Sequence, residues 1–326
     1  MRISVTTMTL AAFLRMTCGW RNVALGLWAA TLVVPAAGER PLRTQANPAD
    51  YWVATDHLSR TLPGHEVAGP RRPGKVVGIF YFLWCGYHAD RVHDVTKILA
   101  TGEPEKHWGP KGATHFWGEP EYGYYHSSDP WVIRRDLQML VNAGVDFIYL
   151  DVTNAILYEK TVDVLLETIR KMRSEEIPAP GVVFTTNTAS GKVMNRIHER
   201  FYKGGKHDDL WFKWDGKPLI FGQEDDPELR PEVRSSFTIK FSWAWTKTKV
   251  EPNHWQWIDT SPQDYGWSDS PDKPEQIPVA VASHATNSIG RSHHKGSHPP
   301  VGPDYRTKFS AQGLHFEEQW LSLIHI

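Results

Sequence analysis

The feature that most constrains the fold of this chain is an alternation of short apolar runs with amphipathic helical stretches. The first run, residues 76–84, is apolar at nearly every position, and such a run is typical of a strand buried on both faces of a parallel sheet. Asp129 and Pro130 then supply an N-cap and a first-turn proline for a helix that we expect to end at Gly144. Strands that alternate with helices in this way predict βα units and a parallel sheet.

The alternation continues along most of the chain, with further helices predicted over residues 159–174 and 191–203 and a turn over residues 215–217. Strands are expected over residues 76–84, 145–151, 181–188, 218–221, 237–245 and 277–284. Six such strands in an α/β chain of 326 residues favour a (β/α)8 TIM barrel over an open sheet, with about six of the eight strands present. No Gly-x-Gly-x-x-Gly motif follows any of these strands, which disfavours a dinucleotide-binding fold.

The N-terminal region has the three parts of a secretory signal peptide. Arg21 gives a positive flank, residues 23–34 are apolar, and small residues follow up to Gly38. The apolar run is shorter than the roughly 20 residues that a membrane-spanning helix needs. We therefore expect residues 1–38 to be a signal peptide with an upstream extension, and the mature protein to be secreted or periplasmic.

The rest of the sequence divides into three segments. Residues 39–74 form an expected N-terminal linker segment, and residues 75–320 form the barrel. Because two strands of a complete barrel are missing from the pattern, we expect the barrel to be truncated at its C-terminus. Residues 321–326 resemble the translation of a sequencing adaptor, so we interpret them as a non-native tail.

Composition narrows the classes of partner. The chain has 36 Lys+Arg against 37 Asp+Glu, without the basic excess that nucleic acid or an anionic membrane surface requires. Two cysteines cannot build a disulfide framework or a Cys-rich zinc module. The 16 histidines form no His-x-x-x-His pattern on an expected helix, so we expect no metal and no other cofactor. The oligomeric state is left open.

Tryptophan is the unusual component, with 15 residues. This is more than a core of this size needs, and Trp at such density is typical of flat apolar platforms for a ligand. In barrels the active site lies at the C-terminal ends of the strands. The residues that we expect there to bind substrate are Trp84, Tyr124, Asn154, Asn187, Gln223, Trp243, Trp245 and His284. Aromatic faces stack on sugar rings and amides bond to hydroxyls, so a carbohydrate is the predicted partner.

Hydrolysis of a glycosidic bond requires two carboxyl groups that flank the scissile bond. Asp151 is the best placed candidate, because it ends a predicted buried strand. Glu119 and Glu121 are candidate catalytic partners, because they lie among aromatic residues and glycines in the long loop before the first helix. Three more glutamates compete for the partner position: Glu224, Glu317 and Glu318.

Other interpretations of the same residues stay open. Cys85 follows a strand, as a nucleophile would, but no histidine and acid can be assigned to it, and a lone Cys more often packs as a small apolar group. The loop with Trp255 and Trp257 either faces a ligand or packs as a lid on the barrel rim. For the function, the alternatives are a non-catalytic carbohydrate-binding barrel and a polysaccharide lyase in which Arg291 binds a uronate.

Several motifs in this order and spacing resemble those of a known family. They are Gly-Ile-Phe-Tyr-Phe-Leu-Trp (78–84), Trp-Gly-Glu-Pro (117–120), Asp-Pro-Trp-Val-Ile (129–133), Ala-Gly-Val-Asp-Phe (143–147), Leu-Asp-Val-Thr-Asn (150–154), Asp-Gly-Lys-Pro-Leu-Ile (215–220) and Phe-Glu-Glu-Gln-Trp (316–320). Together they resemble secreted bacterial proteins described as glycoside hydrolase family 71/99-like, over about residues 75–320.

The resemblance implies a (β/α)8 barrel that acts on O-glycosidic bonds without a cofactor, in an exported protein that degrades polysaccharide. It also implies a further strand-end carboxylate after Trp320, beyond the end of this sequence. At the exit of the first strand it implies His, where this chain has Cys85.

Overall fold

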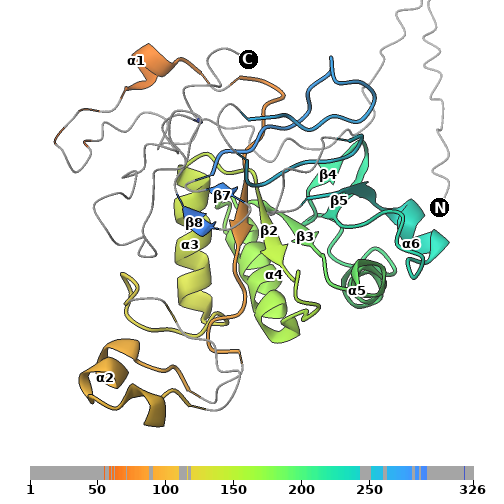
Figure 1. Cartoon of the computed structure of the whole chain (residues 1–326). Coiled ribbons are helices and arrows are strands. Elements are labelled where there is room, and N and C mark those ends of the chain that lie inside the picture. Colours follow the sequence, from red (N-terminus) through yellow and green to blue (C-terminus); the bar gives the residue numbers. More distant parts are fainter. Residues whose placement is uncertain are drawn as a thin grey trace, which may run out of the picture. The chain divides into compact units, whose positions relative to one another are not determined.

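The described part of the chain is built around a sheet of five parallel strands, shown in the computed structural model of Figure 1. The strands are β1 (Gly78–Tyr81), β2 (Phe147–Asp151), β3 (Gly181–Thr185), β5 (Lys217–Phe221) and β6 (Thr238–Lys240). They pair with one another in this order, and every pairing is parallel. The predicted α/β class and its parallel sheet are therefore confirmed.

The structure describes residues 55, 59, 61, 63–70, 72–87, 91–109, 116, 119–242, 251–259, 263–280, 283–285, 288–291 and 319. They belong to one compact unit, Pro41–Ile326. The expected signal peptide over residues 1–38 and the expected tail over residues 321–326 lie outside the described residues.

Each crossover between neighbouring parallel strands contains at least one helix, as βα units require. The helices are α1 (His65–Ala68), α2 (Val95–Ala100), α3 (Pro130–Asn142), α4 (Glu159–Ser174), α5 (Ser190–Ile197) and α6 (Pro231–Ser236). A short 3₁₀ helix (Pro104–Lys106) follows α2, and α5 continues as a π-helical turn (His198–Tyr202). All six α-helices directly precede or follow a strand of the sheet along the chain.

Local sequence signals fix the ends of α3. The Asp129 side chain accepts hydrogen bonds from Trp131 N at 2.9 Å and Val132 N at 3.3 Å, which satisfies two backbone donors of the first turn. Gly144, with φ +87°, ends the helix in the left-handed conformation that favours glycine. Both predicted ends of this helix are confirmed, and α4 occupies the range predicted for it.

One face of the sheet is covered by α3, α4 and α5. Ile148 and Phe184, on neighbouring strands, are fully buried against Leu137 of α3 and Leu165 of α4. The two helices α3 and α4 lie side by side along this face (Figure 1). This layer holds the largest group of buried side chains in the described part of the chain.

The opposite face of the sheet is covered by aromatic side chains. Trp255, only 5 % exposed, packs in one apolar cluster with Phe147, and Trp257 stacks on Phe80 with ring centroids 4.6 Å apart. A Cβ on Gly78 would lie 2.2 Å from the Phe147 ring, so only glycine fits there. Trp255 of this loop therefore packs against the sheet, and Trp257 stacks on it while it stays partly exposed.

A buried ion pair ties this loop to the sheet. Lys240, the last residue of β6 and 2 % exposed, donates from Nζ to Glu275 Oε2 at 3.0 Å and to Asn253 Oδ1 at 3.1 Å. Trp255 Nε1 donates to the same Glu275 oxygen at 3.1 Å. Burial raises the pKa of Glu275, but hydrogen bonds from Ser268, Lys240 and Trp255 outweigh it, so the pKa is lowered overall.

The turn between Asp215 and Lys217 is confirmed. Asp215 and Gly216 have φ +52° and +78°, which is the geometry of a two-residue hairpin turn. It joins β5 to the short strand β4 (Lys213–Trp214), which pairs antiparallel with β5 and was not predicted.

The predicted sixth strand over residues 277–284 is wrong. Residues 277–280 lie in no strand, and β7 (Ser283–Ala285) pairs antiparallel with β8 (Ser288–Arg291) in a separate two-stranded sheet. A backbone donor of the expected strand bonds to a side chain instead: Ala280 N donates to Gln319 Oε1 at 2.5 Å. A strand ladder cannot use the same donor.

The described residues contain the repeating unit of the predicted barrel, but a closed barrel is not confirmed. Consecutive parallel strands with intervening helices are what a (β/α)8 barrel requires. Beyond β6, the described residues continue the parallel pairing as a single bridge between Phe241 and His254. Within the described ranges no strand pairs with the second edge of β1, so these residues form an open sheet. Residues 243–245 of the predicted fifth strand lie outside the described residues.

We expect Trp255→Ala to lower the free energy of unfolding by about 3–5 kcal/mol, because it removes a large buried ring and leaves a cavity. Trp131→Ala is the matched control: Trp131 is 61 % exposed, and its loss should cost about 0.5 kcal/mol. Urea denaturation of both variants checks this. Equal losses in the two variants would contradict the packing of Trp255 against the sheet.

Candidate functional site

The C-terminal ends of the parallel strands meet at one edge of the sheet, where hydrogen bonds join the loops that follow them. Thr186 N donates to Phe221 O at 2.8 Å, and Thr188 N donates to Thr153 O at 2.9 Å. These bonds hold the loops after β2, β3 and β5 beside one another. The residues at and after the ends of β1, β2, β3 and β5 are here called the strand-end rim. They are residues 84–87, 151–158, 186–190 and 222–224.

Asp151 is the carboxylate of the strand-end rim. It is the last residue of β2, and its side chain is partly buried. Its Oδ1 accepts hydrogen bonds from Thr153 N at 3.1 Å and from Thr153 Oγ1 at 2.7 Å, so the turn fixes the orientation of the carboxylate. Within the described residues nothing donates a hydrogen bond to its Oδ2.

The loop after β2 carries an aromatic ring on strained backbone. Tyr158 has φ +50°, in the left-handed region that non-glycine residues rarely adopt. Its ring is buried, and Asn154 Nδ2 donates to its hydroxyl oxygen at 2.5 Å. Tyr87, from the turn after β1, packs edge-on against this ring with centroids 4.6 Å apart. Burial raises the pKa of Tyr158, and the hydrogen bond from Asn154 offsets part of this effect.

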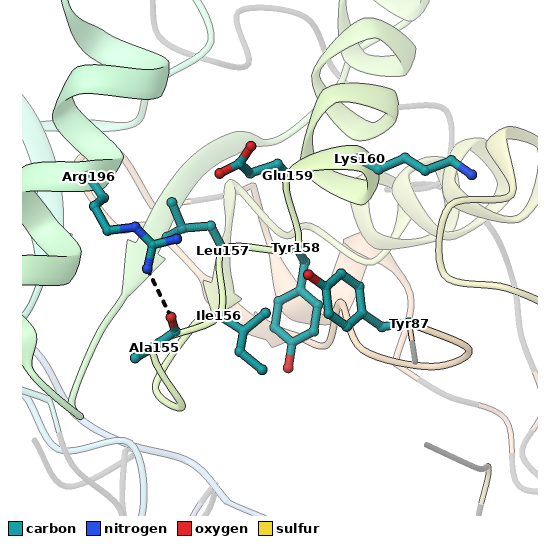
Figure 2. A pocket seen from close by; sticks show the side chains of 8 residues that line it. All are labelled: Tyr87, Ala155, Ile156, Leu157, Tyr158, Glu159, Lys160 and Arg196. Atoms are coloured by element: carbon teal, nitrogen blue, oxygen red, sulfur yellow. Dashed lines mark hydrogen bonds between the residues drawn. The ribbon is translucent and has the colours of Figure 1, made fainter. Parts of the chain in front are cut away.

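A hollow of about 490 Å³ opens at this loop (Figure 2). It is lined by Tyr87, Ala155, Ile156, Leu157, Tyr158, Glu159, Lys160 and Arg196. Figure 2 shows Arg196 reaching from α5 toward the loop, where its NH1 donates to Ala155 O at 3.2 Å. The volume is within the range of about 300–1,000 Å³ that is usual for small-molecule sites. Aromatic rings beside a guanidinium suit a polar ligand with a flat apolar face.

Glu119 and Tyr124 both contact Thr96 of α2. The Thr96 hydroxyl donates to Glu119 Oε2 at 3.4 Å and lies 2.9 Å from the Tyr124 hydroxyl. Glu121 is exposed. This part of the long loop after β1 therefore packs on its own short helix, and no contact between either glutamate and Asp151 is formed in the described part of the chain.

Three other predicted substrate-binding residues lie at the strand-end rim. Trp84 is partly buried and packs edge-on against Phe82, with ring centroids 5.6 Å apart. Asn187 and Gln223 are partly exposed, directly after β3 and β5. The remaining predictions fall outside the described residues: all of Trp243 and Trp245, and the side chain of His284 in β7.

A second polar pair, which sequence reasoning missed, lies between β1 and α3. Tyr81 Oη donates to Asp136 Oδ2 at 3.0 Å. Burial raises the pKa of Asp136, and the hydrogen bond from Tyr81 offsets only part of this effect. Burial and the neighbouring Asp136 carboxylate raise the pKa of Tyr81 well above its usual value. One sequence signal could have identified this pair: Asp136 lies three residues after the buried Ile133, so it falls on the apolar stripe of the helix.

Cys85 does not have the environment of a nucleophile. Burial raises the pKa of its thiol, and a hydrogen bond with Ser127 offsets part of this effect. A thiol that keeps its proton is a weak nucleophile. The same two residues serve a structural role, because Ser127 N donates to Cys85 O at 2.9 Å and closes the long loop on the exit of β1.

Sequence reasoning also missed Tyr87, Tyr158 and Arg196, because no motif distinguishes them from surface residues. Within the described ranges, no group of three or more His, Cys, Asp or Glu side chains is placed to hold a metal ion. The described residues include no helix that is long and apolar enough to cross a membrane.

Comparison with known proteins finds no family model and no curated protein that matches the chain. Among solved structures, the chain is similar to the GH99 endo-α-mannosidase from Bacteroides thetaiotaomicron, with a TM-score of 0.35 and 17% identity over 52% of this chain and 56% of that chain. The structure of that enzyme in complex with Bis-Tris-propane gives a TM-score of 0.36 and 18% identity over 52% and 53%. The chain thus spans about half the length of these structures.

We expect the buried Asp136 carboxyl to make stability depend on pH. Because its pKa is raised in the folded protein, its contribution to the free energy of unfolding is present below the ordinary value of 3.8 and is lost as pH rises through the raised pKa. Asp136→Asn should remove this loss while it keeps an acceptor for Tyr81. Urea denaturation between about pH 3 and 7 measures the effect.

Asp94→Asn is the control, because the pH dependence of stability expected from Asp94 is opposite to that expected from Asp136. The pKa of Asp94 is lowered, mainly by the backbone hydrogen bond from Lys97, so its contribution is lost as pH falls. A parallel pH profile for wild type and Asp136→Asn would show that Asp136 is not held in a raised-pKa environment.

Proposed function

We propose that this chain is a glycoside hydrolase that cleaves O-glycosidic bonds of a poly- or oligosaccharide at the strand-end rim. The observation that carries the proposal is Asp151: a partly buried carboxylate at the end of a parallel strand, oriented by Thr153. Strand ends are where α/β barrels place catalytic groups. The neighbouring hollow, with its tyrosine rings, supports a sugar as the ligand.

In this proposal Asp151 is one of the two carboxyl groups that glycoside hydrolysis requires. Glu119 and Glu121 are the proposed partners, because their loop is bonded to the exit of β1 through Ser127 and Cys85. A movement of this loop toward the rim would bring a glutamate to the opposite side of the sugar. Asn154, Asn187 and Gln223 would bond the sugar hydroxyls along the rim.

The proposal extends to the setting in which the chain acts. A signal peptide over residues 1–38, as the sequence predicts, would place the protein outside the cytoplasm, where polysaccharides occur. Trp84, at the rim, would add a further aromatic face for the sugar chain. No metal or organic cofactor takes part in the proposed reaction.

Asp151→Asn tests the assignment. The amide keeps the size and the hydrogen bonds with Thr153 but cannot act as base or nucleophile, so we expect hydrolysis to fall by about 100-fold or more with an unchanged midpoint of thermal unfolding. The release of reducing ends from a panel of neutral and acidic polysaccharides measures it. Asp215→Asn, in the exposed β4–β5 turn, is the matched control and should keep full activity.

Each alternative function gives a distinct result in the same assay. Saccharide binding without any release of reducing ends would favour a non-catalytic carbohydrate-binding barrel. An unsaturated product that absorbs ultraviolet light would favour a polysaccharide lyase. Full turnover by Asp151→Asn would remove Asp151 from the mechanism.

A further inference from the structure

We propose that the hollow beside the strand-end rim binds a uronic acid residue, with the sugar ring on the exposed Tyr87 and the carboxylate on Arg196 (Figure 2). The inference rests on the proposed function and deepens it, because it names an acidic polysaccharide as the substrate class. It also holds for a protein that only binds such a glycan.

The aromatic part of the hollow has a fixed geometry. The ring of Tyr158 is 2 % exposed and is held through its hydroxyl by Asn154 at 2.5 Å. Tyr87 packs edge-on against it and is itself 38 % exposed. A ring that is supported from one side and exposed on another can carry the C–H face of a sugar without first being ordered.

Arg196 supplies the charge. One nitrogen of its guanidinium donates to Ala155 O at 3.2 Å, which fixes the planar group at the hollow. The described residues give it no carboxylate partner. A guanidinium that is fixed at one nitrogen and unpaired at the others is suited to bind a carboxylate through two parallel hydrogen bonds.

The lining also carries one carboxylate. Glu159 lies 3.7 Å from Arg200 Nε, but Arg200 bonds Asp163 more closely, at 2.6 Å, so it neutralises Glu159 only in part. Figure 2 shows the Lys160 side chain pointing away from Tyr87 and Arg196, so Arg196 supplies the positive charge beside the rings.

The chemistry excludes the simpler ligands. A metal ion would meet the positive charge of Arg196, and a wholly apolar ligand would cover guanidinium N–H groups without accepting a hydrogen bond from them. A neutral sugar could use Tyr87 but would form only weaker hydrogen bonds with Arg196. A sugar with a carboxylate uses both features of the hollow.

Titration calorimetry of the whole chain with oligogalacturonate and with the corresponding neutral galacto-oligosaccharide tests the inference. We expect oligogalacturonate to bind more tightly, and Arg196→Gln to weaken its binding by about tenfold or more while it weakens neutral binding by a much smaller factor. Arg196→Lys keeps the charge but not the two parallel donors of the guanidinium, so its affinity for oligogalacturonate should lie between those of wild type and Arg196→Gln. Lys192→Gln, on the same helix and paired with Glu228, is the matched control and should bind like wild type.

Equal binding of the acidic and neutral oligosaccharides, or unchanged binding by Arg196→Gln with a native circular dichroism spectrum, would overturn the inference. Separate measurements of binding and of turnover distinguish this inference from the proposed function. Oligogalacturonate binding without hydrolysis supports the inference and removes only the hydrolase. Hydrolysis of neutral glycans without oligogalacturonate binding removes only the inference.

Discussion

The constraint on which the rest of the structure depends is the burial of a parallel sheet on both faces. Its crossovers place α3, α4 and α5 on one face only, so the other face needs a different cover. The chain provides that cover with the loop that carries Trp255 and Trp257. Trp255 and Trp257, two of the many tryptophans of the chain, therefore pack on the sheet, whereas Trp84 lies at the strand-end rim with Tyr87 and Tyr158.

The loop that covers this face is attached by charge as well as by ring packing. An ammonium such as that of Lys240 is costly to bury, and the cost is offset only when its partners are well placed. Glu275, Asn253 and Ser268 supply these partners around the Nζ atom. Removal of either member of the pair would leave an uncompensated buried charge, so the end of β6 and the loop are expected to form or unfold together.

The sequence predicted the parts of the fold that follow from local signals. Asp129 and Gly144 mark the ends of α3, and the apolar runs locate the parallel strands, because capping and burial act over a few residues. It did not predict that residues 277–280 would bond to Gln319, because a side-chain contact across almost 40 positions leaves no local pattern. Strand β4 was missed for a related reason, since a two-residue strand has no period to detect.

The candidate site was predicted in its position along the strands but not in its composition. Asp151, Asn187 and Gln223 were identified from their places after strands, and the structure puts all three at one edge. Tyr87, Tyr158 and Arg196 meet only because three separate loops and helices converge, and convergence of this kind is a tertiary property. The exposed Glu119 and the neighbouring Tyr124 were expected at the rim, and instead they contact Thr96.

The left-handed backbone of Tyr158 has a consequence for how this domain can change. Such a conformation costs about 1–2 kcal/mol in a residue with a side chain, so glycine would stabilise the loop locally. Glycine would also remove the ring that supports Tyr87. Because that ring is 2 % exposed and belongs to the main core cluster, its loss would cost about 3–5 kcal/mol, more than the strain that glycine relieves. Core packing and the support of Tyr87 therefore both select an aromatic residue here, in spite of the strained backbone.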